Sequence, residues 1–198
     1  SITFVRPFAT NDEPASRKRI LTCDPGTGKA CVNEIISRLA RRAYRRPVTE
    51  TEVSQLGRFF DLAVKEGLTP EQSIQLSIQA MLVSPNFLFR LERDPNPTDP
   101  EAHHKVSDIE LASRLSYFIW NSMPDEQLLS LAEAGKLSAP ATLNAQVDRL
   151  LADDRAASFS ESFAGQWLEI RALSSVNPDP EKFPSWKLVQ PEVLFADS

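Results

Sequence analysis

The sequence predicts an all-α protein built from two consecutive small helical modules. Apolar residues recur at intervals of three and four along most of the 198 residues, which is the spacing of one face of an α-helix. Several of these segments open with Ser or Thr followed three residues later by Glu or Gln, the pattern of an N-terminal capping box. They end at glycine or shortly before proline, as helices commonly do. No internal repeat and no low-complexity tract is present.

The first predicted helix has one apolar face and ends before Pro47, because the residue that precedes a proline disfavours the helical conformation. That face consists of Val32, Ile35, Ile36, Leu39 and Ala43. Two further helices follow, so that residues 30–83 form three consecutive helices. The second begins at the capping box of Thr49 and Glu52 and ends at Gly67. The third begins at Thr69, with proline at its first helical position.

Arginines cluster around the end of the first helix, at positions 38, 41, 42, 45 and 46. Cations are favoured at the carbonyl end of a helix, and a guanidinium group can hold a carboxylate or a phosphate with two parallel hydrogen bonds. The cluster could therefore bind an anion or a partner, or it could form charge pairs. We favour charge pairing with carboxylates of this chain or of a partner subunit, chiefly by Arg42 and Arg45, because the remainder of the chain is acidic. The candidate charge-pairing or anion contacts are Arg41, Arg42, Arg45 and Arg46.

The stretch SPNFLFRLER that follows is too short for periodicity to separate a helical turn from an extended segment. The next stretch, DPNPTDPEAHHK, combines prolines with polar residues, a composition typical of a connection. We therefore predict an N-terminal module over residues 1–95, with a disulfide loop and three helices. A C-terminal helical module with an irregular tail is predicted over residues 104–198.

The second module is predicted to contain four helices. The first starts at Ser107 and Glu110 and is apolar around much of its circumference, which predicts a central position. The second starts at Pro124 and stops at Gly135, and the third starts at Ser138. The last carries Phe159, Phe163, Trp167 and Ile170 on one face. Core packing is the favoured role for Trp120 and Trp167, whereas a surface for a sugar or a cofactor is the alternative for these and for Trp186.

Cys23 and Cys31 are the only cysteines, and the stretch between them contains a proline and two glycines that favour a tight reversal. This arrangement predicts a local disulfide, and the alternative is a pair of buried free thiols. A disulfide would indicate an oxidising compartment.

Composition and motifs exclude several classes of function. A net charge of −5 and a pI near 5.2 argue against a general nucleic-acid binder. The sequence has no run of about 20 apolar residues, so it predicts no transmembrane segment. His103 and His104 have no third ligand at metal spacing. The stretch CDPGTGKA lacks the residues of a phosphate-binding loop. We therefore predict no catalytic, cofactor-binding or metal-binding residues in this chain.

Four stretches carry a family resemblance, which covers roughly residues 31–183. They are LARRAYRRPVTETEV, SIQAMLVSPNFLFRLER, LSYFIWNSMPDEQLLSLAEAGKL and QVDRLLADDRAASFSESFAGQWLEIRAL. Here the sequence is similar to a family of large exported proteins, abundant in planctomycetes and related bacteria, that carry several adjoining domains of unknown function. In many members a cytochrome c segment lies upstream.

The resemblance implies a periplasmic or cell-surface location and no particular reaction. The leading hypothesis is a non-catalytic helical module that docks against other domains or subunits of an exported, cytochrome c-associated redox assembly. Haem c would then belong to a neighbouring domain or subunit. The alternative is part of an extracytoplasmic oxidative or hydrolytic enzyme that acts on polymeric carbon.

Overall fold

The computed structural model describes residues 14–90, 92, 96–99, 104–169, 179 and 181–183. Its regular elements are all helical over these residues, so the predicted all-α class is confirmed. The chain divides into two compact units, Ser1–Arg93 and Asp94–Ser198, each with its own hydrophobic core. The two units are described separately below.

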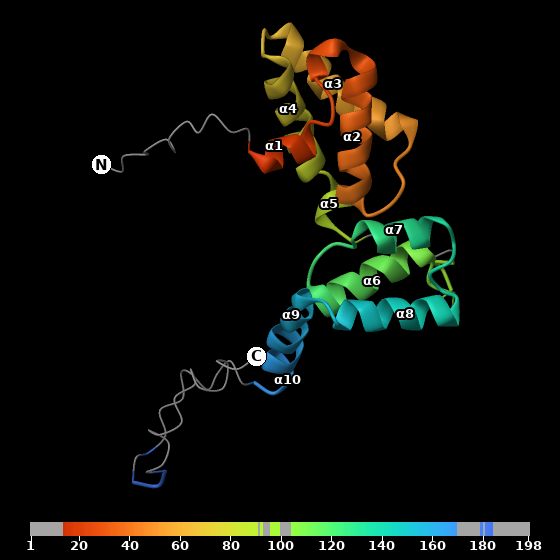
Figure 1. Cartoon of the computed structure of the whole chain (residues 1–198), viewed down its shortest axis with the longest axis vertical. Helices are drawn as coiled ribbons and strands as arrows, with labels where there is room; N and C mark the ends of the chain where they lie inside the picture. The colour runs from red at the N-terminus through yellow and green to blue at the C-terminus, as the bar shows by residue number, and fades with distance from the viewer. Residues whose placement is uncertain are drawn as a thin grey trace. The chain divides into compact units, whose positions relative to one another are not determined.

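The first unit contains the three predicted helices and three shorter elements (Figure 1). In chain order they are α1 (Ala15–Ile20), η1 (Pro25–Thr27), α2 (Lys29–Tyr44), α3 (Glu50–Lys65), α4 (Pro70–Leu82) and α5 (Pro85–Leu88). The stretch that periodicity left undetermined forms one helical turn, α5, followed by extended backbone at Phe89. Both predicted capping boxes are present, from Thr49 to Glu52 and from Thr69 to Gln72.

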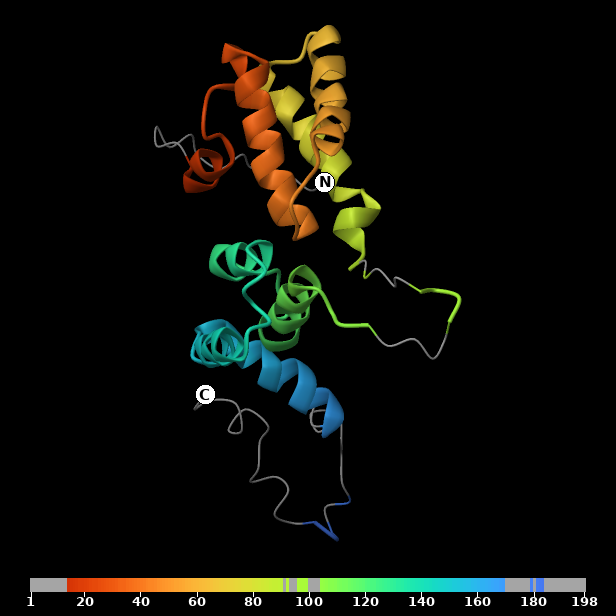
Figure 2. The ribbon, with the colours of Figure 1, turned by 90° about the vertical axis from the view of Figure 1, so that its right-hand side faces the viewer.

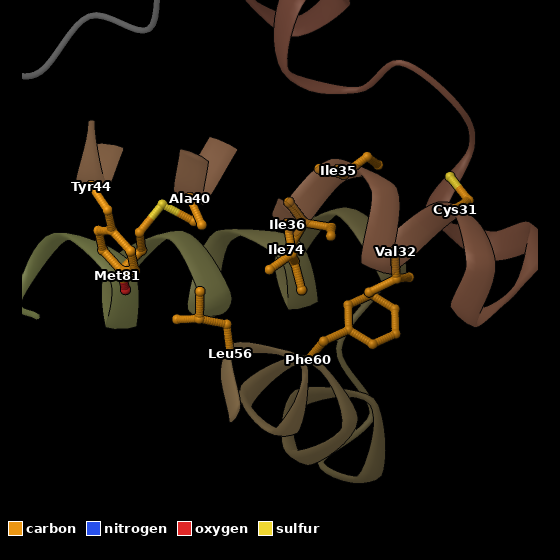
Figure 3. Close-up of a cluster of buried hydrophobic side chains, with 10 residues drawn as sticks. All are labelled: Cys31, Val32, Ile35, Ile36, Ala40, Tyr44, Leu56, Phe60, Ile74 and Met81. Atoms are coloured by element: carbon orange, nitrogen blue, oxygen red, sulfur yellow. The ribbon is translucent and has the colours of Figure 1, made fainter. Parts of the chain in front are cut away.

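The core of the first unit lies between α2, α3 and α4. Figure 3 shows this cluster, with Val32 and Phe60 toward one end and Tyr44 and Met81 toward the other. Ser77 is buried among these apolar side chains and donates its hydroxyl to the Leu56 carbonyl oxygen at 3.1 Å. The bond satisfies a buried hydroxyl group that would otherwise destabilise the core.

The predicted disulfide between Cys23 and Cys31 is confirmed, with the two Cα atoms 6.0 Å apart. It joins the loop after α1 to the first turn of α2. Arg38 of α2 donates to the carbonyl oxygens of Arg19 and Ile20 at the end of α1. These contacts hold the short helix α1 against α2.

The second unit has more elements than the four predicted helices. They are α6 (Asp108–Trp120), α7 (Glu126–Glu133), α8 (Pro140–Leu151), η2 (Asp154–Ala156), α9 (Ala157–Phe159), η3 (Ser160–Ala164) and α10 (Gly165–Trp167). The last predicted helix is thus a succession of short elements, drawn in Figure 2 as one continuous blue ribbon, and its η3 segment is a π-helix. The helices predicted from Pro124 and Ser138 begin two residues later than the sequence pattern indicated, at Glu126 and Pro140.

Trp120 is the central aromatic residue of the second core, as predicted, with 3 % of its surface exposed. Its indole nitrogen donates to the Leu150 carbonyl oxygen at 2.9 Å. The guanidinium groups of Arg149 and Arg155 lie 5.6 and 3.4 Å from its ring centroid. The ring therefore packs against the core and also attracts two cations from α8 and η2.

Asp125 connects α7 to α8. It caps α7 by accepting the Leu128 amide, and it forms an ion pair with Arg149 at 2.7 Å. Burial raises the pKa of the Asp125 carboxyl, but the hydrogen bonds from Arg149 and Leu128 outweigh this effect and leave the pKa lowered.

Candidate docking surface

Of the four candidate arginines, Arg46 forms the kind of charge pair that the sequence suggested. Its guanidinium donates to both Glu52 carboxylate oxygens, at 2.6 and 3.1 Å, and to the Asn86 side-chain oxygen at 3.0 Å. Glu52 also accepts the Thr49 amide at 2.9 Å in the capping box of α3. The Arg46 hydrogen bond, more than any other contact, lowers the pKa of Glu52 to about 2. The pair therefore ties the end of α2 to the start of α3 and to α5.

Arg45 uses its guanidinium differently. It is 5 % exposed and donates to the main-chain carbonyl oxygens of Asn86 at 2.9 Å, Phe87 at 3.3 Å and Phe89 at 2.8 Å. These carbonyl groups lie at the end of α5, where the helix leaves its oxygens without intrahelical partners. Carbonyl acceptors of this kind were not expected from the sequence, and pairing of Arg45 with a carboxylate remains a prediction.

Arg41 and Arg42 lie in the last turn of α2, where Arg41 is half-buried and Arg42 is exposed. A charge-pairing or anion-binding role for these two remains a prediction. The arginine cluster as a whole thus contributes at least three side chains, Arg38, Arg45 and Arg46, to the internal architecture of the first unit.

An exposed row of aromatic side chains in the second unit is the more distinctive surface feature. We call it the aromatic row, and it consists of Phe118 of α6, Phe159 of α9, Phe163 of η3 and Trp167 of α10. Phe159 stacks on Phe163 with centroids 5.3 Å apart, and Phe163 stacks on Trp167 at 6.1 Å. Phe118 meets the first two rings edge to face, at 5.0 and 5.9 Å.

Three members of the row are largely in contact with solvent. Phe118 is 58 % exposed, Phe163 48 % and Trp167 74 %. For aromatic side chains of roughly 150–250 Å² each, these fractions correspond to about 350 Å² of apolar surface. A contiguous patch of this size is comparable to the largest patches of typical soluble proteins, which are often functional.

The core role predicted for Trp167 is therefore wrong, and Phe163 is also half exposed rather than buried. Periodic spacing correctly placed these residues on one face of one helical segment. It did not show what covers that face. Trp186, the third tryptophan, lies outside the described residues.

A π-helical segment runs from Ser160 to Ala164 and carries Phe163. Phe159 lies directly before this segment, and the two rings stack with an interplanar angle of only 8°. Such π-helical segments often occur at functional sites.

The row is anchored to the rest of the second unit at its base. The Ser158 hydroxyl donates to the Ile119 carbonyl oxygen at 3.2 Å, next to Phe118 on α6. Phe159, which is half-buried, contacts both Phe118 and Phe163. The row is thus held on two packed segments, and its four side chains carry no charge. It is suited to binding an apolar surface and offers no group for acid–base or nucleophilic chemistry.

Phe118 was not expected as a surface residue. The available signal was the composition of the helix Asp108–Trp120, which is apolar around more of its circumference than one core can cover. A second apolar face indicates either that the helix is buried on all sides or that it carries a docking surface. In the structure, the Phe118 side chain on α6 is exposed.

The described part of the chain contains no group of three or more His, Cys, Asp or Glu residues that could hold a metal ion. None of its helices is long and apolar enough to cross a membrane.

Comparison with known proteins supports the two-part organisation. Residues 31–92 match the model of the family described as PSD5, Protein of unknown function (DUF1595), and residues 106–195 match that of PSD4, Protein of unknown function (DUF1592). A search of curated proteins found no match, and a search of solved structures found none either. The chain is therefore similar to two families of unknown function that match it one after the other. This agrees with the domains of unknown function in the resemblance noted above and does not bear on the cytochrome c segment.

Proposed function

We propose that this chain is a non-catalytic helical module whose second unit docks onto another domain or subunit through the aromatic row. The observation that supports the proposal is the exposure of Phe118, Phe163 and Trp167 as one anchored, uncharged surface. Aromatic side chains commonly supply most of the binding energy of protein interfaces. Burying this surface against a partner would remove apolar area from water, which would stabilise the complex.

A protein partner suits the row better than a polysaccharide. A sugar ring packs on the flat face of an aromatic ring, and the middle ring of the row, Phe163, already stacks with two neighbouring rings. Phe163 has Phe159 on one side and Trp167 on the other. The ring edges that remain can be enclosed by side chains of a packed helix or loop. The row therefore favours a docking module over an enzyme that acts on polymeric carbon.

The setting that we propose is an exported, cytochrome c-associated assembly at the periplasmic face or the cell surface. A disulfide between Cys23 and Cys31 is in keeping with an oxidising compartment. The family resemblance of the sequence supplies the cytochrome c association, with haem c held in a neighbouring domain or subunit. The partner would thus be another part of that assembly.

Mild purification of the tagged chain from its native cells, followed by mass spectrometry and a visible absorbance spectrum, tests this proposal. We expect one partner in fixed ratio to the chain, together with haem absorbance. Trp167→Ser should lose that partner without a change in the unfolding temperature of the chain, and Phe163→Ser should lose it with a modest decrease, because Phe163 contacts three neighbouring rings. Leu151→Ser is the matched control, because Leu151 is 52 % exposed on α8 and lies outside the row.

Retention of the partner by both row variants would refute the docking role of the row. A partner that carries no haem would refute the cytochrome c association and leave the docking role intact.

A further inference from the structure

The first unit contains an open groove between α2 and α3, with a volume of about 680 Å³. Val32, Val48 and Val53 form an apolar part of its lining, which we call the floor. Small side chains from both helices form much of its walls, among them Ser37 of α2 and Ser54 of α3. Its size falls within the range of ligand-binding clefts.

Gly57 is the feature of this groove that folding does not explain. It lies inside α3, where glycine is less stable than alanine because it loses more conformational freedom on folding. Its backbone does not have the positive φ that favours glycine. A Cβ atom at this position would only touch the Asn33 side-chain oxygen, at an ordinary contact distance of 3.9 Å. The glycine is therefore required by neither backbone geometry nor packing, and its effect is to keep the groove open.

The lining positions recur along both helices with helical spacing. On α3 they include Glu50, Ser54, Gly57 and Asp61, which form one face over about three turns. Two roughly coextensive helical faces with an apolar floor between them form the type of groove that accepts a third helix. Small wall residues would allow that helix to approach closely.

The rim of the groove is net negative. Among the described residues that line the groove, Glu34, Glu50 and Asp61 carry carboxylates and Lys29 carries the one positive charge. Lys29 pairs with Asp61 at 3.0 Å. Glu34 accepts a hydrogen bond from the Thr22 hydroxyl at 3.3 Å, and this neutral donor does not cancel the negative charge of the Glu34 carboxylate. Lysine or arginine along the edges of a segment that fills the groove would therefore favour its binding.

We propose that this groove binds an amphipathic helix of a partner protein, with small and aliphatic side chains on its inner face and basic side chains along both edges. The inference is independent of the aromatic row, because it concerns the first unit. Asn33, Ser37 and Ser54 would provide polar contacts at the walls, and the valines of the floor would cover the aliphatic side chains.

Two designed peptides test the proposal. Each is a fluorescently labelled helix of about 18 residues, or roughly five turns, and both have the same alanine and leucine face. One carries lysine along both edges and the other glutamate. Fluorescence anisotropy with the full chain at low salt should show binding of the lysine peptide, weakening as salt is added, and little binding of the glutamate peptide.

Variants of the full chain locate the site. Gly57→Leu fills the groove and should weaken binding of the lysine peptide by about tenfold or more, equivalent to about 1.4 kcal/mol. Gln55→Leu adds the same side chain to an exposed position of α3 outside the groove and should leave binding unchanged. Glu34→Gln combined with Glu50→Gln should weaken binding and reduce its dependence on salt.

Equal binding of both peptides, or undiminished binding by Gly57→Leu, would overturn the proposal. Binding only after removal of residues 1–13 would show that the chain itself occupies the groove, and binding only on dilution of a dimer would show that a second copy does. Either result would also overturn the proposal that a helix of another protein binds in the groove.

Discussion

Arg45 provides a sharp test of how the first unit is held together. It has a left-handed backbone conformation, with φ 58°, and its guanidinium makes three hydrogen bonds across to the end of α5, to Asn86, Phe87 and Phe89. Hydrogen bonds from charged groups contribute about 1.5–3 kcal/mol each. Phe89 is 60 % exposed, so water can replace part of what its carbonyl group loses. We therefore expect Arg45→Ala to lower the free energy of unfolding of the first unit by about 2–4 kcal/mol, below the simple sum.

Two further substitutions at this position separate the contributions. Arg45→Gly also removes the guanidinium, but glycine adopts the left-handed conformation without strain. This variant should therefore be about 1 kcal/mol more stable than Arg45→Ala. Arg45→Lys keeps the charge but loses the planar fork that reaches several carbonyl oxygens at once, so its stability should lie between those of the wild type and the alanine variant.

Native-state hydrogen exchange of the full chain measures these effects, because it reports the stability of α2–α5 separately from that of α6–α8. The second unit provides the internal control and should not change. Ordinary surface substitutions change the free energy of unfolding by up to about 0.5 kcal/mol. If all three variants lie within that range of the wild type, Arg45 does not hold α5. Equal stability of Arg45→Lys and the wild type would show that charge suffices without the fork.

Three other substitutions have defined outcomes. Glu52→Gln should destabilise the first unit by about 1–2 kcal/mol at neutral pH. Because the folded pKa of Glu52 is lowered to about 2, the difference from the wild type should be complete above about pH 5 and disappear as the pH falls toward 2, as denaturant titrations at several pH values can show. Replacing both Cys23 and Cys31 with serine should cost about 2.5 kcal/mol by the chain-entropy argument, and mass measurement after unfolding and alkylation should find no free thiol in the unreduced wild type. Trp120→Phe should destabilise the second unit by about 1–3 kcal/mol, because the buried Leu150 carbonyl oxygen loses its donor, and unchanged exchange protection in α8 would contradict this.

Local signals in the sequence predicted most of the helices because the interactions that start them are local. Thr49 and Glu52, or Thr69 and Gln72, lie three positions apart and satisfy each other's backbone amides within one turn. The Cys23–Cys31 disulfide was predictable for the same reason, since a short turn brings the two residues together.

Interactions between distant segments were harder to predict. Arg45 contacts carbonyl groups more than 40 positions away, and nothing in its local sequence distinguishes that role from a carboxylate contact. Trp167 shares its helical face with Phe159 and Phe163, but burial depends on what packs against that face. The aromatic row was therefore not predicted as an exposed surface.

Hydroxyl-radical footprinting of the free chain and of its native complex tests the docking role of the aromatic row most directly. The structure predicts strong oxidation of Phe118, Phe163 and Trp167 in the free chain and weak oxidation of the buried Trp120, which serves as the internal reference. In the complex, the three exposed members of the row should become protected while Leu151 on α8 keeps its reactivity. Oxidation of the row to the same extent in the complex as in the free chain would contradict the proposed function.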